Sequence, residues 1–191
     1  MSDHGFHVHG PHDHALEHAS HSAPASFSGQ LAVITAVLAT VGALFSYMGG
    51  ATHFNAGAYK NDAAIKKTEA ANQWAYYQAK SNKQNLSELG IDIAPEARKT
   101  FYQDEVKRYM TEKDEIKAVA ERLEAESIAF EKKSAQQSHE HHRWAQATTV
   151  LQVSIAMAAI ALLTQRRWLV YGVLGLGVIG TALGAMAWLS V

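Results

Sequence analysis

Uncharged apolar residues form three runs along the chain, separated by one long charged segment and one short turn. The runs cover residues 31–52, 147–164 and 168–189, and none contains an Asp, Glu, Lys or Arg. About 20 apolar residues in a helix match the hydrocarbon thickness of a bilayer. The pattern therefore predicts three transmembrane helices, the last two joined by a tight turn at Gln165 to Arg167.

The charged segment, residues 53–146, has a helical period of its own. From residue 102 its apolar positions recur at alternating steps of four and three, which is typical of a coiled-coil seam. We call this set the 102–130 stripe. We expect it to be buried against another helix, either of the same chain or of a second copy. Its apolar members are Tyr102, Val106, Tyr109, Ile116, Ala120, Leu123 and Phe130, and its other two positions hold Lys113 and Ser127.

A partner for this helix is available in the preceding part of the same segment. Ala63, Ala70 and Trp74 also follow helical spacing there. Gly90 is placed to end a helix in the left-handed conformation, and Pro95 suits the first turn of the next helix. We therefore predict an all-α membrane protein, with three transmembrane helices and a long, coiled-coil-like antiparallel helical hairpin between the first and the second.

Trp74 and Tyr77 lie three residues apart and so share one face of the first hairpin helix. We expect them on its inner face, as an aromatic core. They either fill space between the two helices or line a ligand pocket. Nothing near them pairs a nucleophile with a base.

The third apolar run has small residues along one side. Gly177, Gly180 and Gly184 recur at steps of three and four. Inside a bilayer, helices associate by close contact, which small side chains allow. This face therefore predicts helix packing within the chain or between subunits.

Composition narrows the functional classes. The chain has 17 basic and 18 acidic residues, mixed within the charged segment, so no basic patch for nucleic acid is expected. Cysteine is absent, which excludes disulfides and thiol chemistry. The sequence also has no phosphate-binding glycine loop. We predict a protein that is not an enzyme and requires no cofactor.

Histidines are the one metal-ligating residue type that clusters. Residues 1–30 form a His-rich tail that we expect to be flexible, because it has no periodic apolar face. Within the charged segment, His53, His139 and His142 lie next to the apolar runs. Both ends of a hairpin return to one membrane surface, so these three side chains are a candidate site for Zn²⁺ or Ni²⁺. The alternative is that they contact lipid headgroups or each other.

Basic residues suggest an orientation in the membrane. Arg166 and Arg167 lie in the shortest loop, which favours the cytoplasm for that turn. The N terminus would then be cytoplasmic and the hairpin periplasmic. Lys60, Lys66 and Lys67, near the membrane ends of the hairpin, favour the opposite orientation.

Two short motifs carry a resemblance to a known family. The segment from Gln73 to Ser81 reads QWAYYQAKS, and Arg166, Arg167 and Trp168 precede the last run. With these motifs the chain resembles, over nearly its whole length, an uncharacterised bacterial membrane-protein family known only as a domain of unknown function. The resemblance implies a multi-pass protein of the bacterial inner membrane and carries no activity with it.

The leading functional hypothesis is a structural inner-membrane protein whose projecting hairpin forms a homo-oligomeric scaffold. Its partners would be the lipid bilayer, further copies of itself and other membrane proteins. The alternative is a divalent-metal-binding envelope protein that uses the His-rich tail and the membrane-proximal histidines.

Overall fold

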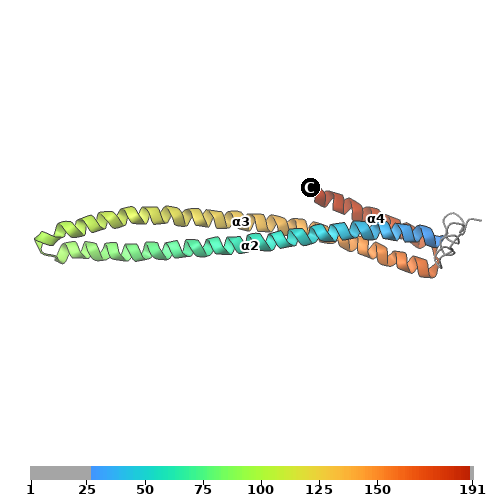
Figure 1. Ribbon diagram of the computed structural model, residues 1–191, viewed down its shortest axis with the longest axis horizontal. Coiled ribbons are helices and arrows are strands. Elements are labelled where there is room, and N and C mark those ends of the chain that lie inside the picture. The colour runs from blue at the N-terminus through green and yellow to red at the C-terminus, as the bar shows by residue number, and fades with distance from the viewer. Residues whose placement is uncertain (1–26, 190–191) are drawn as a thin grey trace, which may run out of the picture. The chain divides into compact units, whose positions relative to one another are not determined.

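A computed structural model describes residues 27–189 and shows three helices in that part of the chain. They are α2 (Phe27–Ile93), α3 (Glu96–Thr164) and α4 (Arg167–Trp188), shown in Figure 1. The described residues contain no strand, so the predicted all-α class is confirmed for them. Residues 1–26 of the predicted His-rich tail lie outside the described residues. The last four of the 30 residues assigned to the tail belong to α2.

No helix end separates the apolar runs from the charged segment. The boundaries expected near residues 52 and 146 fall inside α2 and α3, respectively. A change from apolar to charged side chains leaves the backbone hydrogen bonds of a helix intact, and only proline removes one. Pro95 is the only proline among the described residues, and α2 ends two residues before it.

The turn between α2 and α3 differs from the expectation at Gly90. This glycine has no positive φ, and α2 continues past it to Ile93. A Cβ atom added at Gly90 would lie 2.8 Å from the ring of Tyr102, so the residue provides room for that ring instead of a left-handed helix end. Pro95 and Glu96 do stand at the start of α3, where the Pro95 carbonyl accepts the Arg98 N–H at 2.9 Å.

The second turn, between α3 and α4, is as short as expected. Gln165 has a φ of 52°, in the left-handed region, and α4 begins at Arg167. The Arg166 carbonyl accepts the N–H of Leu169 at 3.1 Å. Two residues therefore suffice to reverse the chain.

The described residues divide into two compact units, one of residues 27–43 and 147–182 and the other of residues 44–146 and 183–189. In the first unit, two of the predicted small residues of α4 lie against other helices of the same chain, namely α2 and α3. A Cβ atom added at Gly177 would lie 2.9 Å from the side chain of Leu38, and one added at Gly180 would lie 2.7 Å from the side chain of Leu151. Ser154 of α3 donates to the Val173 carbonyl at 2.7 Å. Glycine therefore lets α4 approach its neighbours closely.

In the second unit, α2 and α3 lie side by side (Figure 1). Ala56, Ala63 and Ala70 are the buried alanines of α2 there. Gly184, the third of the predicted small residues, also belongs to this unit, and a Cβ at this position would overlap the ring of Phe45. That ring lies 5.3 Å from the ring of Trp144, measured between centroids.

Candidate functional site

Three side chains of α3 bond to the backbone of α2 at intervals of seven residues. In each pair the α3 residue number rises by seven as the α2 number falls by seven, so the two helices run in opposite directions here. The bonded α2 group is always a carbonyl oxygen. We call these contacts the heptad ladder. The pairs are Ser127 with Ala63 (2.9 Å), Ser134 with Ala56 (2.8 Å) and His141 with Gly49 (2.8 Å).

The ladder needs small residues on α2. A serine hydroxyl is short, so it reaches a carbonyl of a neighbouring helix only where the backbones approach closely. Ala56 and Ala63 are 6% and 3% exposed, which leaves no room for a longer side chain. A carbonyl oxygen only accepts hydrogen bonds, so Nδ1 of His141 is protonated and donates its N–H to the Gly49 carbonyl. Each such bond contributes about 0.5–1.5 kcal/mol.

We predict that Ala63→Leu destabilises the second unit, because the added side chain must push α3 away and break the bond from Ser127. Overpacking of this kind costs about 1–3 kcal/mol in free energy of unfolding. Guanidinium unfolding of the full chain in detergent, followed by circular dichroism, measures it. Ala118→Leu, at an exposed position of α3, is the matched control and should change the free energy by less than about 0.5 kcal/mol. Equal effects of the two changes would contradict the ladder.

The 102–130 stripe lies against α2 of the same chain. Tyr109, Ile116 and Leu123 are buried, each no more than 9% exposed, whereas Tyr102, Val106 and Phe130 are partly buried. Phe130 stacks on Tyr59 of α2 with ring centroids 6.3 Å apart. In this arrangement one chain covers its own stripe. The use of this stripe between copies stays a prediction, and it would require the copies to exchange helices.

Lysines and tyrosines fill the middle of the helix pair. Lys80 of α2 forms a short ion pair with Glu112 of α3, and its Nζ lies 5.5 Å from the centroid of the Tyr109 ring. Lys113, the charged residue within the stripe, lies 5.0 Å from the Tyr77 ring centroid. An ammonium group over an aromatic ring is attracted by the ring's quadrupole. These contacts explain how charged side chains occupy positions that face the partner helix.

The ion pair shifts the acid–base equilibria of both partners. The hydrogen bond from Lys80 lowers the pKa of Glu112 below its usual 4.5, and the bond to Glu112 raises the pKa of Lys80 above its usual 10.5. A carboxyl with a lowered pKa stabilises the fold above its unfolded pKa and loses that effect as the pH falls through the folded pKa. For the lysine the effect is lost as the pH rises. The pair therefore stabilises the unit between about pH 4.5 and pH 10.5.

We expect Glu112→Gln to lower the melting temperature of the full chain in detergent at pH 7. The difference from wild type should shrink as the pH falls towards 3, because protonation of Glu112 removes the same ion pair from the wild type. Thermal melts at several pH values measure this. Glu121→Gln, in an exposed pair with Lys117 at 3.8 Å, is the control and should have a smaller effect at every pH. A difference that does not depend on pH would contradict the assignment.

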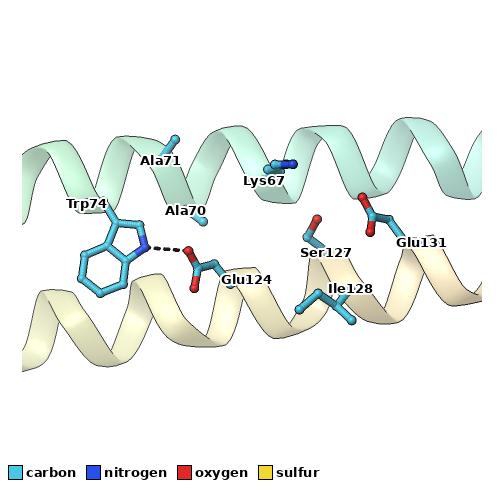
Figure 2. Close-up of a pocket in the computed structure, with 8 residues that line it drawn as sticks. All are labelled: Lys67, Ala70, Ala71, Trp74, Glu124, Ser127, Ile128 and Glu131. Atoms are coloured by element: carbon cyan, nitrogen blue, oxygen red, sulfur yellow. Dashed lines mark hydrogen bonds between the residues drawn. The ribbon is translucent and has the colours of Figure 1, made fainter.

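A groove runs beside the predicted aromatic residues. It encloses about 350 Å³, and a second hollow of about 410 Å³ adjoins it, with Lys67 and Glu131 lining both. Figure 2 shows the indole of Trp74 reaching from α2 to Glu124 of α3, whose carboxylate accepts the Nε1–H at 2.8 Å. Alanines 70 and 71 complete the α2 wall. The groove thus offers apolar surface beside charged groups.

Trp74 and Tyr77 are neighbours, with ring centroids 5.7 Å apart in an edge-on arrangement. Both are partly buried. They lie at the boundary between α2 and α3, and Trp74 faces the groove. Helical spacing found this pair. Helical spacing did not predict that Glu124 is the partner of Trp74. An acidic residue next to the 102–130 stripe cannot be told apart, in the sequence, from the other charged residues that face water.

The structure groups the histidines differently from the sequence prediction. His53 lies beside His141, with ring centroids 5.0 Å apart, and His142 adjoins His141 at 5.9 Å. His139 is exposed. Among residues 27–189 no group of three potential metal-ligating side chains comes together. The sequence prediction did not include His141, although this residue follows Ser127 and Ser134 at the same interval of seven.

Comparison with known proteins gives a match to a family model. A family model described as a domain of unknown function, DUF4337, matches residues 27–190. No curated protein and no solved structure matches the chain. The matched range takes in all three helices.

Proposed function

Because the chain belongs to the DUF4337 family, whose description names no activity, we propose a function from the structure itself. We propose a structural, self-associating membrane protein without catalytic activity. Three helices would anchor it in the bilayer, and the charged parts of α2 and α3 would project as a helical hairpin that scaffolds or spaces other membrane proteins.

Three helices of the described chain are long and apolar enough to cross a membrane. Large side chains on them face outward, including Val33 at 65%, Leu163 at 84% and Val178 at 67% exposed. Apolar surface of this extent is costly in water and is covered at no cost by lipid. These exposures support the bilayer as the first partner.

The observation that carries the proposal is the contact along the charged segment. Cross-helix bonds begin at Gly49 with His141 and continue to Gln84, which Lys113 bonds at 3.0 Å. The segment is thus used to hold two long helices together. We propose that such a pair holds a surface away from the membrane anchor, which would suit assembly.

We propose the bacterial inner membrane as the location, with the QWAYYQAKS motif as a signature of the family. Arg166 and Arg167 at the turn before α4 would be cytoplasmic, as basic residues in short loops are. The N terminus would then be cytoplasmic and the hairpin periplasmic.

Light scattering on the full chain in lipid nanodiscs or mild detergent tests self-association. We expect a protein mass of at least two chains of 20.8 kDa after subtraction of lipid or detergent. In detergent, dilution should shift the mass downward, because reversible association depends on concentration. A mass of one chain at every concentration would rule the scaffold out.

Metal binding is the second candidate, and the contact of His141 with His53 favours it. The Nδ1–H of His141 is held by the Gly49 carbonyl, which leaves Nε2 directed elsewhere. Histidines that bind metals usually donate their other ring N–H in this way. Zn²⁺ or Ni²⁺ could be shared by the two rings, with additional ligands from the tail or from water.

Calorimetric titration of Zn²⁺ into the full chain tests this site. We expect a variant with both His53→Ala and His141→Ala to lose one class of binding site. The matched control, with both His139→Ala and His142→Ala, should retain it. If both double variants bind like the wild type, this pair of histidines is not a metal site.

A further inference from the structure

The exposed large apolar residues of α2 in the second unit fall on one stripe. From Phe54 to the end of the helix, every such residue except Tyr76 lies on positions that alternate by four and three. Phe54 and Ile93, at its two ends, are 74% and 76% exposed. We call these positions the outer stripe of α2. It lies on the side of the helix opposite Ala56, Ala63 and Ala70, which face α3.

Two interleaved series make up the outer stripe, and all their members are exposed. The first series is Ala58, Ile65, Asn72, Ala79, Leu86 and Ile93. The second series is Phe54, Asn61, Thr68, Ala75, Asn82 and Leu89. Such a pattern of core positions is that of one strand of a coiled coil.

No position of the outer stripe is charged. The equivalent outward side of α3 carries charges at similar spacing, among them Asp104, Glu115 and Arg122. A helix side that faces only water has no reason to exclude charge. The absence of charge from one side of α2, in a strongly charged segment, indicates that this side is covered.

We propose that the outer stripe of α2 pairs with the same stripe of a second copy, parallel and in register. The inference rests on the proposed function, since two chains anchored alike in one membrane must present α2 in the same direction. It names the surface through which the copies associate, which is not the 102–130 stripe.

The asparagines favour a second copy over an unrelated partner. Asn72 lies near the middle of the outer stripe, and Asn61 and Asn82 lie in the other series. In a parallel pair in register, each asparagine amide lies opposite the amide of the same asparagine in the second chain. Each amide can then both donate and accept a hydrogen bond. A polar residue at a core position of a coiled coil specifies register at some cost in stability. An apolar groove or lipid would leave these amides unpaired.

Charges beside the outer stripe are compatible with this pairing. On one side the flanking positions are uncharged up to the last heptad, namely Gly57, Ala64, Ala71, Gln78 and Asn85, and Asp92 follows at the end of the helix. On the other side are Asp62, Glu69 and Lys83. In a parallel coiled coil each flank faces the opposite flank of the partner, so these three meet no like charge.

The surface is large enough for a specific dimer. Twelve core positions, with the two flanking positions of each heptad, give about 24 residues from each copy, within the roughly 20–30 a side of a standard interface. Alanine and asparagine make the contact weaker than a leucine-rich one. Confinement in one membrane raises the effective concentration and offsets that weakness.

Single cysteines test the pairing, because the natural chain has none. Ala79→Cys puts a thiol in the outer stripe, and Ala118→Cys puts one at an exposed position of α3 as the matched control. Facing core positions of a parallel coiled coil lie within disulfide reach. With mild oxidant, the full-length chain in nanodiscs or membranes should cross-link at residue 79 at least about tenfold faster than at residue 118.

A second change shows whether the stripe itself holds the copies together. Adding Ile65→Lys to the Ala79→Cys chain should slow cross-linking, because two lysines would meet in the seam. Adding Ala125→Lys, on the exposed side of α3, should leave it unchanged. Circular dichroism of each variant confirms that the helices persist.

The outcomes separate this inference from the proposed function. Equal or slower cross-linking at residue 79 than at residue 118, in a chain that light scattering shows to be associated, overturns the outer stripe and leaves self-association standing. A single-chain mass with no cross-linking overturns both. Fast cross-linking at residue 79 that Ile65→Lys does not slow also overturns the outer stripe as the contact.

Discussion

The close approach of two helix backbones is the constraint on which the second unit depends. Gly49, Ala56 and Ala63 recur every seventh residue on the side of α2 that faces α3, and each offers a carbonyl to a polar side chain of α3. Small residues act here as they do in membranes, where they let helices touch. In the first unit Gly177 and Gly180 have the same effect on α4. One packing principle thus serves both the apolar and the charged parts of the chain.

This arrangement gives the two sides of α2 different tasks. Its inner side carries small residues such as Ala56 and Ala63, which repeat and give little specificity. The specific contacts of the helix pair therefore come from longer side chains at the edges, such as Lys80 and Trp74. The outer stripe carries no charge and includes larger side chains such as Phe54 and Ile65. α3 is the reverse, with its apolar stripe turned inward and its charges outward. This difference between the two helices is the reason why we propose α2 as the helix that pairs with another copy.

Sequence patterns predicted which side of each helix is buried and much less about what covers it. Ala63, Ala70 and the 102–130 stripe were found by period alone, because a buried side imposes spacing whatever the partner. Gly90 was misjudged, since a glycine that ends a helix and one that makes room for Tyr102 look alike in sequence. The sequence prediction placed His53 with His139 and His142 and did not include its neighbour His141, for a related reason. The neighbour of His53 is set by the axial register of two helices, and local sequence does not encode that register.

The heptad ladder by itself does not fix the axial register of α2 and α3. Because its period is seven on both helices, sliding α3 by one heptad, about 10.5 Å, would return serines and carbonyls to equivalent places. The ladder alone is therefore nearly indifferent to such a slip. The alignment must come from contacts that occur once, such as Tyr102 against Gly90 and the two-residue turn beside it. The turn between α2 and α3 thus sets the axial alignment of the two helices that it connects.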